Sequence, residues 1–241
     1  LGNLGNASPQ VVEALLGLLK DESQIVRNSA AQVLGNLGNA SPQVVEALLG
    51  LLKDESQIVR NSAAQVLGNL GNASPQVVEA LLGLLKDESQ IVRNSAAQVL
   101  GNLGNASPQV VEALLGLLKD ESWSVRNSAA QALGNLGNAS PQVVEVLLGL
   151  LKDKTEIVRY SVAEALGNLG NASPQVVEAL LGLLKDESQT VCNSAAKVLG
   201  KLGKNSSNVT ATVAEWISQH QDSKYVGSGI DALWNLVVTE E

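Results

Sequence analysis

The sequence has few of the side chains that build catalytic sites, metal sites and aromatic cores. Its 241 residues include no Phe and no Met, one Cys and one His, and only 2% are aromatic. A single cysteine, Cys192, excludes a disulfide within the chain, and a single histidine, His220, offers no set of metal ligands. Because 45% of the residues are nonetheless hydrophobic, the core must be built from Leu, Val and Ala.

Long apolar runs and basic clusters are also missing. The longest apolar stretch, VVEALLGLL, is interrupted by Glu13 and is far shorter than the ~20 residues of a membrane span. No secretory signal is visible. The net charge is −8 without a basic stripe, so we expect no nucleic-acid partner. These absences predict a cytoplasmic protein, and the lack of Met indicates a fragment or processed piece of a longer chain.

The prolines mark a strict internal repeat. All six lie 33 residues apart in the phrase NASPQVVE, at Pro9, Pro42, Pro75, Pro108, Pro141 and Pro174. Such self-similarity is typical of stacked-repeat proteins. We therefore expect a single solenoid domain with six repeats over 6–203. Residues 1–5 would be the end of a truncated preceding repeat, and 204–241 a degenerate C-terminal capping repeat.

Each repeat contains start and stop signals for two helices. Ser followed by Pro predicts the start of a first helix over 9–20. Ser23 predicts the cap of a second helix over 24–37, which Gly38 ends in the left-handed conformation. The first helix is apolar except for a narrow stripe of Gln10, Glu13, Gly17 and Lys20. Neighbouring repeats must cover its flanks, so we expect an all-α fold of stacked antiparallel helix pairs.

The repeat also carries a family pattern. LLxxDxxxxVRxxAAxxLGxLG, in six copies over 9–203, resembles the HEAT-like repeats of the phycobilisome-lyase type. The resemblance implies a right-handed α-solenoid of the armadillo/HEAT kind, with second helices lining a concave binding surface. It further implies a structural ladder of turn aspartates and helix arginines along the seams between repeats. The ladder residues are Asp21, Arg27, Asp54, Arg60, Asp87, Arg93, Asp120, Arg126, Asp153 and Arg159. Asp186 continues the aspartate series, but Cys192 replaces the next arginine, so the ladder should end there.

The repeats differ from one another mainly on the solvent side of the second helix. Trp123 and Tyr160 replace a Gln and an Asn of the first repeats, while Ile25 begins a row of isoleucines beside these positions. Aromatic anchors and exposed apolar rows are typical of protein-binding surfaces. The candidate partner-binding residues are Gln24, Ile25, Asn28, Gln57, Ile58, Asn61, Gln90, Ile91, Asn94, Trp123, Asn127, Gln131, Glu156, Tyr160 and Glu164.

Local packing is an equally good interpretation of the apolar candidates. Trp123 can fold over its own turn and shield Leu118 or Val125. Each isoleucine of the row can pack against the start of the next second helix. The glycines equivalent to Gly17 lie on the polar stripe, where Gly costs about 1 kcal/mol relative to Ala, and their role stays open.

The C-terminal segment is a degenerate repeat. NVTATVAEWIS and GSGIDALWNLV replace the two helices, with about one residue inserted between them. Terminal repeats are atypical because they close the open end of a core. We therefore interpret Trp216 and Trp234 as packing residues of a cap, and His220 as a solvated loop residue. The truncated N-terminal end predicts weak head-to-tail self-association.

Three functions fit these features. The first is a non-catalytic scaffold that binds a protein or peptide, as a segment of a larger bacterial protein. The second is a bilin lyase-type or other chromophore-handling protein, because the repeat family takes its name from such lyases. The third is an engineered or recently duplicated array without a specific partner. The sequence offers no nucleophile, acid–base pair or repeated His, which favours a scaffold that needs no cofactor.

Overall fold

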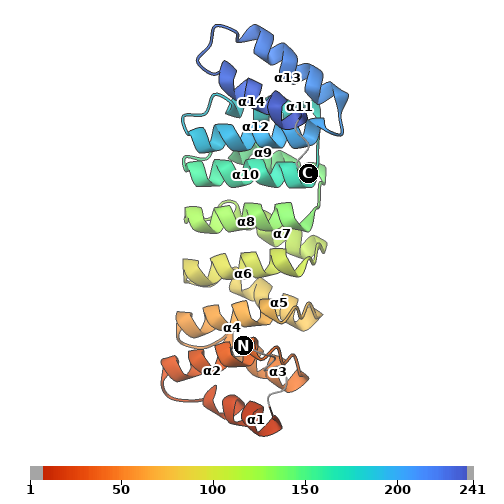
Figure 1. Ribbon diagram of the computed structural model, residues 1–241. Coiled ribbons are helices and arrows are strands. Elements are labelled where there is room, and N and C mark those ends of the chain that lie inside the picture. Colours follow the sequence, from red (N-terminus) through yellow and green to blue (C-terminus); the bar gives the residue numbers. More distant parts are fainter. Residues whose placement is uncertain (1–7, 238–241) are drawn as a thin grey trace. The chain divides into compact units, whose positions relative to one another are not determined.

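The computed structural model describes residues 8–237, and this part of the chain contains fourteen α-helices and no strand (Figure 1). The first helices of the pairs, called A helices, are α1 (Pro9–Leu18), α3 (Pro42–Leu51), α5 (Pro75–Leu84), α7 (Pro108–Leu117), α9 (Pro141–Leu150), α11 (Pro174–Leu183) and α13 (Ser207–Gln219). The second helices, called B helices, are α2 (Gln24–Asn36), α4 (Gln57–Asn69), α6 (Gln90–Leu103), α8 (Trp123–Leu136), α10 (Glu156–Leu169), α12 (Gln189–Gly203) and α14 (Val226–Val237). The expected remnant over 1–5 lies outside the described residues.

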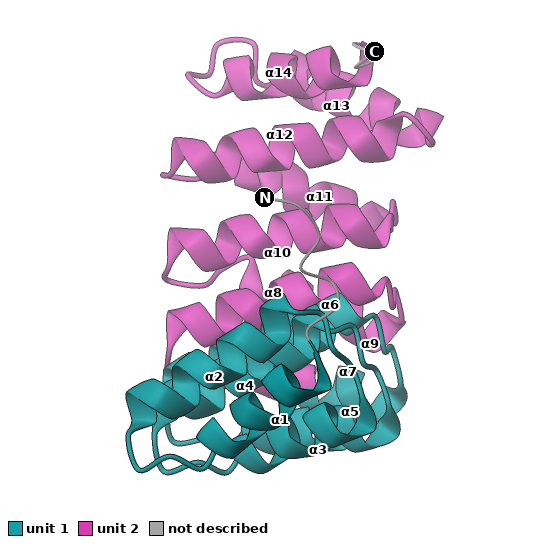
Figure 2. Ribbon diagram, turned by 60° about the horizontal axis from the view of Figure 1, so that its bottom comes forward, with its two compact units in different colours: residues 1–113 teal, residues 114–241 magenta. Residues whose placement is uncertain are grey.

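The chain divides into two compact units, residues 1–113 and 114–241, with the boundary inside α7 (Figure 2). In unit 1, α2, α4 and α6 lie side by side, each paired with its own A helix. In unit 2, α8, α10, α12 and α14 are stacked in the same way. This arrangement confirms the predicted all-α solenoid of helix pairs. Three features remain predictions: the right-handed twist of the solenoid, its concave B-helix surface and its organisation as a single domain.

The helix boundaries follow from local signals. Pro occupies the first turn of each regular A helix, and the preceding loop is tightened where the Ser41 backbone N–H donates to Asn39 Oδ1 at 2.9 Å. Gly38 and its equivalents in the next four repeats have φ between 65° and 71°, which confirms left-handed termination of these B helices. Gly203 instead lies inside α12, which continues to that residue. Ser23 is the N-cap residue of α2, as predicted, but its side chain makes no capping hydrogen bond.

Glycine permits the B helices to approach one another closely. A Cβ added to Gly35 would lie 2.9 Å from Val66 Cγ1, and one added to Gly68 would lie 2.8 Å from Val99 Cγ1. The valines therefore fill the space that a side chain on glycine would need. Leucines complete the core, and Leu67 is fully buried. The regular spacing of B helices in each unit follows from this repeated contact.

The C-terminal pair forms as predicted but in a shifted register. Asn235 lies against Gly200, four residues later than the repeat would place the equivalent of Val198. The expected insertion of about one residue is therefore wrong. Trp216 is buried in α13, whereas Trp234 is 67% exposed on α14. The shift moves Trp234 out of the core register, so its interpretation as a packing residue of the cap is also wrong.

Candidate interaction surface

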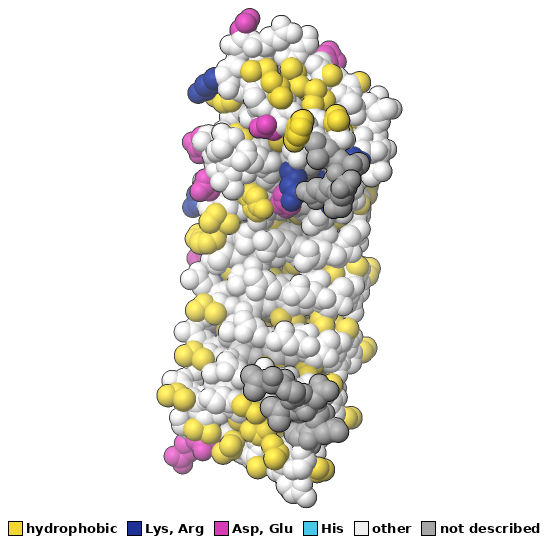
Figure 3. All heavy atoms as spheres, viewed as in Figure 1, with side chains coloured by type: hydrophobic (Ala, Val, Ile, Leu, Met, Phe, Trp, Pro, Cys, Tyr) yellow, Lys and Arg dark blue, Asp and Glu magenta, His cyan; other side chains and the backbone are white. Residues whose placement is uncertain are grey.

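The outer side of the B helices combines uncharged polar side chains with an apolar row. In α4, the exposed or half-exposed residues are Gln57, Ile58, Asn61, Gln65 and Asn69. We call this surface and its equivalents in the other layers the helix-B face. In Figure 3 this face consists mainly of backbone and uncharged polar side chains, drawn white, with hydrophobic atoms, drawn yellow, at the edges of the layers. The predicted candidates Gln90 and Asn94 in α6, and Glu156 in α10, occupy equivalent positions.

The arginines and aspartates of the repeat lie beneath this face and join successive layers. Arg60 Nε and Nη2 donate to the two carboxylate oxygens of Asp87 at 2.8 and 2.9 Å. Arg60 Nη1 also donates to the backbone oxygens of Asp54 and Glu55. The same bidentate pairing joins Arg27 to Asp54, Arg126 to Asp153 and Arg159 to Asp186. Because these arginines are 7% exposed, they hold layers together and offer little charge to a ligand.

The buried pairs alter the acidity of their members. Burial alone would raise the pKa of Asp87, but hydrogen bonds from Arg60 and the Ser89 backbone, together with the charges of Arg60 and Arg93, hold it below its usual value. The pKa values of Asp54, Asp153 and Asp186 are lowered for the same kind of reason. The hydrogen bond to Asp87 raises the pKa of Arg60. Both partners therefore stay charged at neutral pH.

Cys192 occupies the arginine position in α12. Its Sγ donates to the Asp186 backbone oxygen at 3.2 Å, and the side chain is buried. Burial, followed by the negative charge of Asp186, raises the pKa of the Cys192 thiol. A buried thiol with a raised pKa holds little thiolate at neutral pH, which makes it a poor nucleophile.

Serine hydroxyls donate hydrogen bonds to the amide side chains that lie on the helix-B face of the preceding layer. Ser56 Oγ donates to Gln24 Oε1, and Ser62 Oγ donates to Asn28 Oδ1. Equivalent bonds join Ser89 to Gln57, Ser95 to Asn61 and Ser161 to Asn127. At another position of the repeat, Ser194 Oγ donates to Glu164 Oε1, and Gln131 Nε2 donates to Ser161 Oγ at 3.5 Å. The serine expected to cap its own helix therefore bonds across layers instead. Apart from Gln131, whose amide nitrogen is the donor, these candidates contribute to the stack through their side-chain oxygens.

The apolar candidates on the helix-B face are substantially exposed. The isoleucine row has exposed fractions of 72% at Ile25, 53% at Ile58 and 52% at Ile91. In unit 2, Trp123 is 47% exposed and Tyr160 36%. Leu118 and Val125 are buried, but about half of the Trp123 side chain stays accessible above them. The row and the two aromatics can therefore contact a ligand.

The helix-B face also contains a shallow polar groove between α2 and α4. Its volume is about 320 Å³, and Gly35 and Val66, which are in close contact, lie in its lining. The residues that line it are Gln32, Gly35, Asn36, Ser62, Gln65, Val66 and Asn69. Sequence comparison of the repeats missed this groove because its residues hardly vary among the early repeats.

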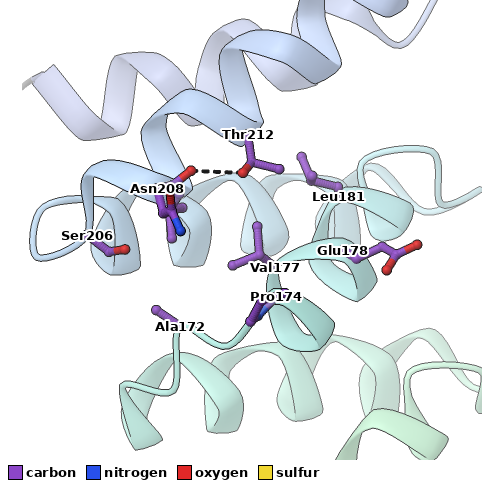
Figure 4. Close-up of a pocket in the computed structure, with 9 residues that line it drawn as sticks. Ala172, Pro174, Val177, Glu178, Leu181, Ser206, Asn208 and Thr212 are labelled. Carbon is purple, nitrogen blue, oxygen red and sulfur yellow. Dashed lines mark hydrogen bonds between the residues drawn. The ribbon is translucent and has the colours of Figure 1, made fainter.

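Two further grooves lie along the A helices of unit 2. One of about 540 Å³ runs beside α9, and one of about 310 Å³ lies between α11 and α13. Figure 4 shows Val177 of α11 and Thr212 of α13 facing the second groove, with Glu178 at its edge. The register of the last pair shapes this groove, so the repeat pattern could not predict it.

The His, Cys, Asp and Glu side chains of the described residues do not form a cluster that could act as a metal site. The ring of His220 stacks on Trp216 with centroids 4.2 Å apart, and its Nδ1–H donates to the Trp216 carbonyl. His220 therefore lies in the turn after α13, as predicted, but it is half-buried against Trp216 instead of fully solvated. Among residues 8–237, no group of three or more His, Cys, Asp or Glu side chains could hold a metal ion. No helix in this range is long and apolar enough to cross a membrane.

Comparison with known protein families identifies the repeat. The model of the family described as HEAT repeats matches residues 1–68, 45–133, 78–167, 112–200 and 150–233. No curated protein matches the chain.

Solved structures with similar folds include natural and designed repeat proteins. YibA of Escherichia coli aligns with 21% identity over 95% of this chain and 98% of its own, with a TM-score of 0.63. The complex of CpcE and CpcF of phycocyanin lyase from Nostoc sp. aligns with 21% identity over 98% of both chains, with a TM-score of 0.60. A designed armadillo repeat protein in complex with the peptide (KR)4 has 20% identity over 79% of this chain and 99% of its own, with a TM-score of 0.57. At these identities the similarity shows a shared fold.

Proposed function

This chain belongs to the HEAT repeat family, and from that premise we propose that it is a non-catalytic scaffold that binds a protein or peptide on its helix-B face. A stack of helix pairs presents one continuous surface per unit, and each layer adds the same set of side chains to it. Binding would then depend on how the layers differ at a few exposed positions.

The exposed isoleucine row carries the proposal. Ile58 and Ile91 occur in neighbouring layers of unit 1, and each leaves more than half of its surface accessible. Rows of apolar side chains on an otherwise polar surface are typical of interaction sites. Trp123 and Tyr160 add aromatic anchors in unit 2, of the kind that contributes most binding energy at interfaces.

The amides beside the row would supply hydrogen bonds to the ligand. Gln57 Oε1 and Asn61 Oδ1 already accept bonds from serines of the next layer. Each side chain is thereby held in place, and its amide N–H groups are the part that a ligand carbonyl would bind. An extended peptide provides such carbonyls at short intervals along its backbone.

The charges favour a protein or peptide over nucleic acid. The net charge is −8, and Arg27, Arg60, Arg126 and Arg159 are buried against aspartates. The cations that remain are eleven lysines, most of them spread one per repeat after the A helices, so they form no basic stripe that could neutralise phosphates. The designed repeat protein that holds the peptide (KR)4 gives a precedent for peptide binding by a related fold.

A chromophore-handling role is the second candidate, because a phycocyanin lyase complex is among the similar structures. Incubation with a phycobilin, followed by gel filtration, distinguishes it. A shifted absorption band that co-elutes with the protein would support this role, and its absence would leave the scaffold.

The scaffold is tested by selecting random peptides on the immobilised chain and measuring their affinity by fluorescence anisotropy. The test variant carries Ile58→Ser, Ile91→Ser, Trp123→Gln and Tyr160→Asn, of which the last two restore the residues of the early repeats. The control carries Gln76→Ser and Glu79→Ser on the exposed side of α5. We expect at least tenfold weaker binding by the test variant, about 1.4 kcal/mol, and no change in the control. Selection of no peptide, as a partnerless array predicts, or equal affinities in all three proteins, would contradict the proposal.

A further inference from the structure

One layer of unit 2 changes the chemistry of the helix-B face. In α12, Lys197 and Lys201 stand where the earlier repeats have Gln and Asn, apart from Glu164 in α10. The two lysines are one helical turn apart on the same side of the helix, and both are exposed. Elsewhere in the described B helices the cations of the repeat are the buried ladder arginines.

The neighbouring layer partly positions these lysines. Lys201 Nζ donates to Asn168 Oδ1 of α10 at 3.1 Å. No hydrogen bond or ion pair within residues 8–237 holds the ammonium group of Lys197. Glu164 lies at the equivalent position of α10, where its Oε1 accepts a bond from Ser194, and Asp231 is an exposed acidic residue of α14. Lys197 therefore keeps its charge available on the surface.

The next layer brings apolar side chains to the same surface. Because Asn235 lies against Gly200, Trp234 takes the position in α14 that Lys197 takes in α12. Ile230 lies one turn earlier on the same side of α14, and its exposed fraction is 54%. Figure 3 shows basic and acidic atoms side by side, near hydrophobic atoms, where the faces of α10, α12 and α14 lie.

We propose that Lys197, Lys201, Ile230 and Trp234 form a docking patch for an extended peptide segment in which carboxylates alternate with aliphatic or aromatic side chains. The carboxylates would pair with the two lysines, and an apolar side chain would cover Trp234 and Ile230. Charge complementarity selects the acidic partner, because two exposed lysines stand one helical turn apart on a chain whose net charge is −8. Glu164 of α10 and Asp231 of α14 border the lysines, so the carboxylates of the ligand must approach along α12 itself. Tyr160 on the preceding layer extends the apolar surface on the opposite side of the lysines. This inference rests on the proposed function and specifies the ligand chemistry that unit 2 would select.

The test uses labelled short peptides and the full chain. One probe alternates Glu and Leu, a second alternates Lys and Leu, and a third alternates Glu and Ser. Fluorescence anisotropy should show tightest binding of the Glu–Leu probe, with affinity that falls as salt is added because exposed charges are screened.

The variants assign that binding to the patch. Lys197→Gln with Lys201→Asn restores the residues of the early repeats, and Lys119→Gln with Lys152→Gln removes the same charge from exposed helix-A ends of unit 2. We expect about tenfold weaker binding of the Glu–Leu probe by the first pair and little change by the second. Trp234→Gln should also weaken it about tenfold, with the helical circular dichroism unchanged.

The experiments distinguish failure of the docking patch from failure of the proposed scaffold function. No binding of the Glu–Leu probe, equal binding of the Lys–Leu probe, or equal effects of the two lysine pairs would overturn the docking patch. The scaffold would still stand if selected peptides require the isoleucine row. If selected peptides ignore the helix-B face while the Glu–Leu probe depends on Lys197 and Lys201, the proposed isoleucine–aromatic site fails and the patch remains.

Discussion

The second and sixth repeats share a framework but present different surfaces. Val59 and Leu67 in α4 correspond to Val191 and Leu199 in α12, and all four side chains are fully buried. On the outside, Ile58, Gln65 and Asn69 of α4 are replaced by Thr190, Lys197 and Lys201. Beneath the surface, Arg60 is replaced by Cys192. The core therefore fixes the fold, while the outer positions are free to define a ligand.

Acid should have the largest effect on stability, and it should act on the layers that contain an Arg–Asp pair. The pKa of Asp87 is lowered in the folded chain, so its stabilising contribution is present above its unfolded pKa of about 4 and is lost as pH falls through the lower folded value. The same sign applies to Asp54, Asp153 and Asp186. Urea unfolding followed by circular dichroism should show a falling midpoint below about pH 4. Asp87→Asn should flatten that dependence; an unchanged slope would contradict the account.

The two tryptophans of the last pair should differ strongly. Trp216 is buried, stacks on His220 and approaches Gly229, so Trp216→Ala should lower the free energy of unfolding by about 4 kcal/mol. Trp234→Ala should change it by less than about 0.5 kcal/mol because the side chain is exposed. Urea unfolding measures both, and similar losses would show that Trp234 closes the core after all.

An arginine of the ladder should contribute more to the free energy of unfolding than the cysteine that takes its position in α12. Arg60→Ala leaves Asp87 buried without its bidentate partner, so we expect a loss of about 3 kcal/mol in unfolding free energy. Cys192→Ala removes a small buried side chain and should cost about 1 kcal/mol. Comparable losses in the two variants would mean that the ladder is not a main link between layers.

Replacement of glycine by alanine should have opposite effects on stability at two positions. A Cβ at Gly134 would lie 2.8 Å from the backbone Cα of Ala165, which cannot move aside easily, so Gly134→Ala should destabilise by about 2 kcal/mol. Nothing lies within 4 Å of a Cβ at Gly50, and Gly50→Ala should stabilise the exposed helix by about 0.5–1 kcal/mol. A loss at Gly50 would indicate a packing role for that glycine series.

The repeat made most of the fold predictable from sequence. Pro42 and Gly71 mark a helix start and a helix end through local conformation, which needs no knowledge of neighbours. The polar stripe was also predicted correctly, since Gln43, Glu46, Gly50 and Lys53 are exposed.

Contacts between layers were less predictable. Ser56 looked like a local cap, yet its hydroxyl bonds Gln24 of the preceding layer. The exposure of Trp234 depends on the shifted packing of Asn235 against Gly200. Both features require the placement of one layer on another, which residue spacing within a helix cannot supply.

The most direct test of the scaffold is hydroxyl-radical footprinting of the chain with and without a selected peptide. Mass spectrometry would compare oxidation of Ile58, Ile91, Trp123 and Tyr160 with that of Pro174 and Thr212 beside the helix-A groove. We predict that the peptide protects the first group and leaves the second unchanged. Protection at Pro174 and Thr212, with full oxidation of the helix-B residues, would contradict the assignment of binding to the helix-B face.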